Sequence, residues 1–216
     1  MFIFNRFMQV NFPRIKNILG AVLLSGAIST FTPIYAQNKL SQDTFVKTSV
    51  PASGTNDKNI ISNAPNPNIK ICGVNKKAKF VVDLSKNVLY TYDSQGKPIN
   101  AYRIASGKPS TPTHSGIRIV THIETYPYKS APKTSKRRRT PKAFGPKVIC
   151  LDIINPKTGE RKHTGEFIHG NNNFASLGKY ASHGCMRMDN DVIKKLSTYA
   201  KPDDIVIILP KKQILK

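Results

Sequence analysis

The segment from Lys79 to Gly107, KFVVDLSKNVLYTYDSQGKPINAYRIASG, alternates β-branched and aromatic residues with polar ones. The runs SKN and DSQGKP interrupt it, and both have the composition of tight turns. A period of two with close turns indicates short antiparallel strands. The runs GIRIVTHIETYPY and KVICLDIIN predict two further strands. The chain is therefore expected to fold as a mostly β protein.

One helix and one more strand follow near the carboxyl end. Asp189 or Asn190 is placed to cap the first turn of the helix, and Pro202 to stop it. Its apolar positions recur at helical spacing: Val192, Ile193, Leu196, Tyr199 and Ala200. The run DIVIILP predicts a closing strand. Because one helix cannot cover so many strands, the sheets must pack on each other. We expect a sandwich-like domain over about residues 70–211.

The amino-terminal region predicts export. RIKNILGAVLLSGAISTFTPIYAQN has a basic start, an apolar run and a small residue, Ala36, at a suitable cleavage position. We predict a signal peptide over residues 1–36 and a mature protein in the periplasm or cell envelope. An uncleaved anchor is the alternative, although the apolar run is short and interrupted by Pro33. Residues 37–69 have few large apolar side chains and predict a flexible linker, and residues 212–216 a basic tail.

The charge balance favours an anionic partner. The chain has 34 Lys and Arg against 12 Asp and Glu, a net charge of +22. Such an excess attracts nucleic acid, anionic lipid or an anionic wall polymer. The densest cluster, KTSKRRRTPK at residues 133–142, predicts an exposed basic loop without a regular strand. No groove-reading motif accompanies it, so no nucleic acid is expected. Attraction to the anionic envelope and a merely solvated loop stay open.

Three cysteines leave one thiol unpaired if two form a disulfide. We expect Cys185 to be the free one. Whether Cys72 and Cys150 form a disulfide or are separate buried thiols stays open, because sequence does not supply the distance a disulfide requires.

The stretch SHGCMRM carries the residue types of thiol catalysis. A nucleophilic cysteine needs a group that takes its proton, and histidine is the usual one. His169, at the end of the strand-like run EFIHG, suits that role better for Cys185 than His183 does, which lies only two residues before the cysteine. Gly184 lets the backbone turn and present amides to an oxyanion. Arg187 could hold a substrate carboxylate.

These runs, with IHG ending at Gly170, thirteen positions before His183 of HGCMRM, resemble the signature of the L,D-transpeptidases with a YkuD-like catalytic domain. Further segments resemble that domain in the same order: FVVDLSKNVLYTY, ASGKPSTPTHSGIRI, FGPKVICLDI and RMDNDVIKKL. The resemblance covers about residues 76–210. His114 and Ser115 depart from the family pattern, because they intervene before Gly116. The resemblance implies the mostly β fold of that domain with one main helix after the cysteine.

The resemblance also implies roles for single residues. Cys185 is the expected nucleophile and His169 the expected general base. The expected supporting residues are Gly170, whose carbonyl orients His169, and Ser182. The backbone amides of His183, Gly184 and Cys185 are the candidates for an oxyanion site, and Arg187 is expected to bind substrate. No metal and no cofactor is expected.

The implied reaction is acyl transfer on peptidoglycan stem peptides during cell wall biogenesis. A tetrapeptide donor would form a thioester with Cys185 and release D-alanine, and an amine acceptor would then take the acyl group. Carbapenems are expected to acylate the same thiol. The single-domain pattern predicts a monomer.

Several alternatives stay open. The same acyl-enzyme could attach lipoproteins or act as an L,D-carboxypeptidase, which is a hydrolase. The chain could also be a non-catalytic basic protein that binds the envelope. A zinc peptidase is the rival chemistry, with ligand types at His163, His169, His183 and Cys185. We predict that His163 and His114 are exposed loop residues and that His122 is a sheet histidine.

Overall fold

The computed structural model describes residues 50–211. The predicted signal peptide, residues 37–49 of the predicted linker and the predicted basic tail lie outside the described residues. Among residues 50–211, no helix has the length and apolar character needed to span a membrane.

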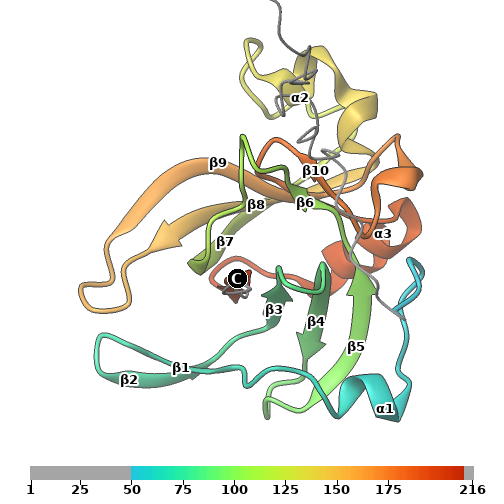
Figure 1. Ribbon diagram of the computed structural model, residues 1–216. Helices are drawn as coiled ribbons and strands as arrows, with labels where there is room; N and C mark the ends of the chain where they lie inside the picture. Colours follow the sequence, from blue (N-terminus) through green and yellow to red (C-terminus); the bar gives the residue numbers. More distant parts are fainter. Residues whose placement is uncertain (1–49, 212–216) are drawn as a thin grey trace, which may run out of the picture. The chain divides into compact units, whose positions relative to one another are not determined.

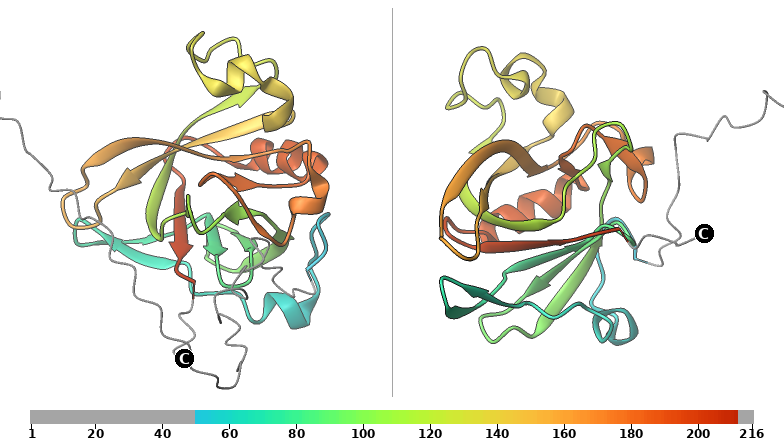
Figure 2. Two further views of the ribbon diagram at one scale, coloured as in Figure 1. Left: turned by 45° about the horizontal axis from the view of Figure 1, so that its top comes forward. Right: turned by 60° about the vertical axis from the view of Figure 1, so that its left-hand side comes forward.

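One eight-stranded sheet forms the domain (Figure 1). Its strands lie in the order β11 (Met186–Arg187), β9 (Arg161–His169), β8 (Lys147–Ile154), β7 (Gly116–Thr125), β12 (Ile205–Leu209), β3 (Phe80–Asp83), β4 (Val88–Tyr92) and β5 (Pro98–Arg103). Neighbours are antiparallel except for two parallel pairs, β11 with β9 and β12 with β3. Figure 2 shows β8 and β9 arching over β3, β4 and β5. The predicted mostly β fold is confirmed, and the sandwich-like layers come from the curling of one sheet.

Helix α3 (Asn190–Tyr199) packs inside this curl. The Asp189 side chain caps it, accepting from the amides of Asp191 and Val192. This confirms Asp189 as one of the two predicted caps. Apolar side chains of the helix pack in one core with β3, β4, β7, β8 and β9, and these members are Val192, Ile193, Leu196, Phe80, Leu89, Val120, Ile149 and Ile168.

A second core lies on the other face of β3, β4 and β12, and it corrects the predicted linker boundary. Residues 50–69 include α1 (Lys58–Ile61) and the start of β1 (Asn68–Ile71), which pairs with β2 (Val74–Lys77). Thr55 exchanges two backbone hydrogen bonds with Ala101 of β5. The apolar side chains of the stretch pack on the sheet: Val50, Ile60, Ile61 and Ile69. Few apolar residues suffice here, because the sheet already offers an apolar face.

The remaining elements surround the carboxyl end of β9. Short strand β6 (Ser106–Gly107) pairs in parallel with β10 (Tyr180–Ser182), and η2 (Phe174–Ser176) precedes β10. Between β7 and β8 the chain forms α2 (Lys136–Arg139) and η1 (Pro141–Phe144), and we call residues 129–146 the cap. The predicted basic loop 133–142 has no strand, as expected, but it folds into these two short helices (Figure 1).

Candidate active site

Strand pairing brings the two ends of the sequence motif together. Met186 lies beside Ile168, and Arg187 beside His169, in the parallel pair of β11 and β9. Met186 and Ile168 point into the inner core. Because side chains alternate along a strand, His169 and Arg187 point to the opposite face. Cys185 precedes β11 and packs against the cluster on that face.

A pocket of about 250 Å³ opens on this face. Its lining comes from the cap, β9 and the loop before β11: Lys136, Ala143, Phe144, Gly165, Phe167, His169, Ser182, His183, Cys185 and Arg187. Five of the predicted site residues therefore share one pocket, namely Ser182, His183, Cys185, Arg187 and His169.

His169 is held as a neutral imidazole. Its Nδ1 lies 2.5 Å from the carbonyl oxygen of Gly170. A carbonyl only accepts, so Nδ1 carries the hydrogen and Nε2 keeps its lone pair. Burial lowers the pKa of His169 to about 4, outweighing the Gly170 hydrogen bond, which raises it. Phe144 of the cap contributes to this burial, since its ring centroid lies 4.8 Å from that of the imidazole.

Cys185 is a partly exposed thiol with a raised pKa. Burial raises its pKa to about 11, although a backbone hydrogen bond from Phe167 and the positive charges nearby lower it. Cys185 and His169 are therefore a neutral thiol and a neutral imidazole, and attack by such a thiol would require a base that takes its proton. All three cysteines are free. Cys72 is exposed in the β1–β2 turn, and burial raises the pKa of Cys150 to about 12.

The turn before Cys185 is fixed by Ser182. Its hydroxyl donates to the Cys185 carbonyl at 2.5 Å and accepts from the Gly184 amide at 3.1 Å. Gly184 adopts φ 114°, a conformation that favours glycine. Its amide is thus already bonded, which differs from the prediction that Gly184 donates to an oxyanion. In the described chain, the amides of His183 and Cys185 have no hydrogen-bond partner.

Sequence reasoning missed several residues that hold this site. The hydroxyl of buried Thr113 donates to the Gly184 carbonyl at 2.7 Å and accepts from the Gly107 amide at 2.9 Å. A Cβ on Gly107 would lie 2.3 Å from the Thr113 nitrogen, so only glycine fits there. The Asn190 side chain accepts from the Asn171 amide at 2.8 Å and fixes the loop after His169. The sequence signals these residues only weakly, because Thr113 and Asn190 are single polar residues in the short runs TPT and DND.

Thr113→Val is expected to destabilise the fold by about 1 to 3 kcal/mol, because it leaves the Gly107 amide and the Gly184 carbonyl unpaired. Urea unfolding of the two proteins measures the difference. Thr134→Val, an exposed threonine of the cap, is the control and should change stability by less than about 0.5 kcal/mol. Equal stability of all three proteins would show that Thr113 does not hold the turn.

Alkylation of Cys185 by iodoacetamide is expected to rise continuously from pH 6 to pH 10. With a thiol pKa of about 11, only about one molecule in ten thousand carries the thiolate at pH 7. A Cys72→Ser background removes the exposed thiol. A rate plateau beginning near pH 6 would instead indicate a preformed thiolate beside a protonated histidine.

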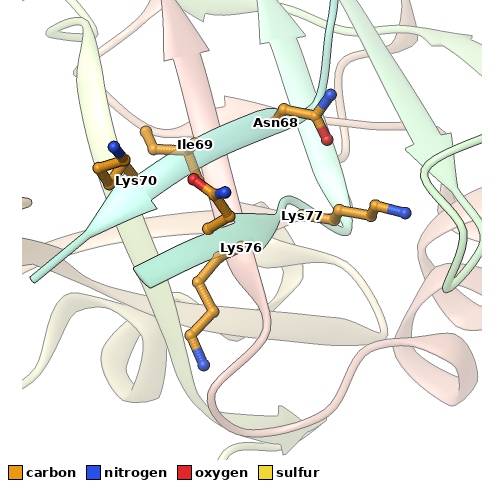
Figure 3. A pocket seen from close by; sticks show the side chains of 6 residues that line it. Asn68, Ile69, Lys70, Lys76 and Lys77 are labelled. Carbon is orange, nitrogen blue, oxygen red and sulfur yellow. The ribbon is translucent and has the colours of Figure 1, made fainter. Parts of the chain in front are cut away.

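Other polar clusters lie away from this pocket. A hollow of about 520 Å³ lies on the β1–β2 hairpin, and its lining residues are Asn68, Ile69, Lys70, Asn75, Lys76 and Lys77. Figure 3 shows this hollow from close by, with Lys70, Lys76 and Lys77 among the labelled side chains. This lining offers no nucleophile with a base. Among residues 50–211, one group could hold a metal: His122, Glu124 and Cys150. Arg137 already binds both carboxylate oxygens of Glu124. The group contains none of the four residues that the sequence suggested as zinc ligands, which are His163, His169, His183 and Cys185. His163 is exposed and bonded to Asp152, but it lies in strand β9 and not in the predicted loop. His114 is an exposed loop residue, as predicted.

A family model of the YkuD L,D-transpeptidase catalytic domain matches residues 77–208, more than half of the chain. No curated protein matches the sequence significantly. Similar solved structures include a protein of Bdellovibrio bacteriovorus (22% identity, TM-score 0.48, covering 68% of this chain and 53% of that one). A mutant of the Enterococcus faecium L,D-transpeptidase is 21% identical (TM-score 0.43, covering 62% and 50%). The chain thus spans about half the length of these two proteins. On the family match, the chain belongs to the family of YkuD L,D-transpeptidase catalytic domains.

Proposed function

We propose that the protein is a cysteine L,D-transpeptidase that cross-links peptidoglycan stem peptides. The observation that carries this proposal is the placement of Cys185 and His169 in one pocket, with the imidazole hydrogen held on Nδ1 by the Gly170 carbonyl. We also propose that the protein acts as a monomer after export to the periplasm or cell envelope.

In the first step, the Cys185 sulfur attacks the carbonyl carbon of the diamino acid in a tetrapeptide donor. Nε2 of His169 takes the thiol proton as the S–C bond forms. The amides of His183 and Cys185 are the donors available for the oxyanion. The C–N bond to the terminal D-alanine then breaks, and His169 returns the proton to the leaving amine.

In the second step, an amine of the acceptor attacks the thioester carbonyl. His169 takes a proton from this amine and delivers it to the departing sulfur, which restores the resting thiol. The half-buried Arg187 guanidinium has no ion-pair partner among residues 50–211. A cation left unpaired in this way supports the predicted role of Arg187 in binding a substrate carboxylate.

Product analysis with a disaccharide tetrapeptide tests the proposal. We expect release of D-alanine together with a cross-linked dimer, and neither product with Cys185→Ala. Release of D-alanine with formation of a tripeptide, and without a cross-linked dimer, would favour the carboxypeptidase alternative. Absence of both products with the wild type would overturn the proposal.

The exposed cations of the cap support a second part of the proposal, that residues 133–142 attract the protein to the anionic envelope. Lys133, Lys136, Arg139 and Lys142 are exposed. Binding to anionic wall material should weaken as salt rises, because screening shortens the range of exposed charges. Unchanged binding between low and high salt would count against it.

A further inference from the structure

The pocket around Cys185 carries positive charge on two walls. Lys136 of α2 and Arg187 of β11 both line it, and its lining includes no carboxylate. Within residues 50–211, neither side chain makes an ion pair. Both charges act on Cys185, and together with Lys108 they lower the pKa of His183, after the larger effect of burial. The pocket is therefore suited to an anionic ligand.

The neighbours of Lys136 fix its backbone over the pocket. Arg137 binds Glu124, a buried carboxylate of β7, through two nitrogens, one of them at 2.9 Å. The same guanidinium lies 4.9 Å from the centroid of the Phe167 ring. Arg138 donates to the carbonyl oxygens of Lys129 at 2.5 Å and Ala131 at 3.2 Å. A buried two-nitrogen ion pair holds its geometry better than an exposed one, so Lys136 is not on a freely moving loop.

We propose that Lys136 determines donor specificity by binding a second carboxylate of the donor, on the side chain of its diamino acid. This inference rests on the proposed function. The leaving D-alanine carries one carboxylate in every donor, and Arg187 stands beside the nucleophile to receive it. A second carboxylate is present in diaminopimelate but absent from lysine or from amidated diaminopimelate. The two cations thus match the two carboxylates of the diamino acid and of the leaving D-alanine.

The test compares two tetrapeptide donors, one with the free side-chain carboxylate and one with its carboxamide. Lys136→Gln is expected to lower kcat/KM for the free-acid donor about tenfold, mainly through KM, since a charge-assisted hydrogen bond is lost. The carboxamide donor should change less than about twofold. Lys136→Arg keeps the positive charge and should therefore retain the preference for the free-acid donor over the carboxamide donor. Lys129→Gln, an exposed lysine of the same cap outside the pocket, should behave as wild type.

Two failures are distinguishable. Wild-type turnover of both donors with an equal loss, or no loss, in Lys136→Gln would overturn the role of Lys136 and leave the proposed function intact. No turnover of either donor by the wild type would overturn the proposed function, and this inference with it.

Discussion

Replacing His169 by alanine is expected to slow acylation of Cys185 by about a hundred- to ten-thousandfold. Burial holds the thiol protonated at neutral pH, with a pKa of about 11. Attack therefore depends on a base that takes the proton as the new bond forms. His169, neutral because burial lowers its pKa to about 4, lines the same pocket. The rate is measured by the time course of adduct formation in intact-mass spectra.

His163→Ala is the matched control for this prediction. His163 is exposed, bonded to Asp152 and absent from the lining of the pocket. Its replacement should leave the acylation rate within about twofold of wild type, as expected for a surface residue that does not touch the reacting atoms. A wild-type rate in His169→Ala would remove His169 from the role of base.

Glu166→Gln is expected to destabilise the fold by about 3 to 5 kcal/mol. Arg118 of β7 is 1% exposed, and its Nε lies 2.5 Å from a carboxylate oxygen of Glu166. Its other contacts are carbonyl oxygens, of His114 at 3.0 Å and Ile117 at 3.3 Å. Without the carboxylate, a buried guanidinium is left uncompensated. A loss of this size is a large part of a typical free energy of unfolding, which is about 5 to 15 kcal/mol.

An exposed ion pair provides the comparison for Glu166. Arg161 and Asp203 lie 2.9 Å apart with side chains 50% and 69% exposed. Asp203→Asn should cost less than about 1 kcal/mol, because water screens such pairs. Asparagine also tolerates the positive φ of 70° at this position. Equal effects of the two substitutions in urea unfolding would contradict the argument from burial.

The local features of the fold were predictable from the sequence. Runs of β-branched and aromatic residues between turn sequences predicted β3 and β4, which are buried on both faces. Helical spacing after an aspartate predicted α3 and the capping of its first turn by Asp189. The place of β12 was not predictable. Its parallel pairing with β3 joins Val206 to Phe80, more than a hundred residues earlier in the chain, and no local pattern encodes such a contact.

Residues of the pocket could be predicted where a short sequence motif carries them, and could not be predicted where a distant segment supplies them. Cys185, His169 and Arg187 stand in short motifs that carry reactive residue types. The contacts of the basic run 133–142 could not be predicted, because runs of charged residues are usually solvated. In the structure, Arg137 binds buried Glu124, and Lys136 lines the pocket. The Gly184 amide was misjudged because its bond to the Ser182 hydroxyl depends on the geometry of the turn.

The central claim is that Cys185 is an activated, acyl-accepting thiol. Intact-mass measurement of reduced wild type and Cys185→Ala after exposure to a carbapenem tests it most directly. We expect one adduct on the wild type and none on the variant, with matching thermal unfolding to show that both are folded. An adduct on Cys185→Ala, or no adduct on folded, reduced wild type, would contradict the account.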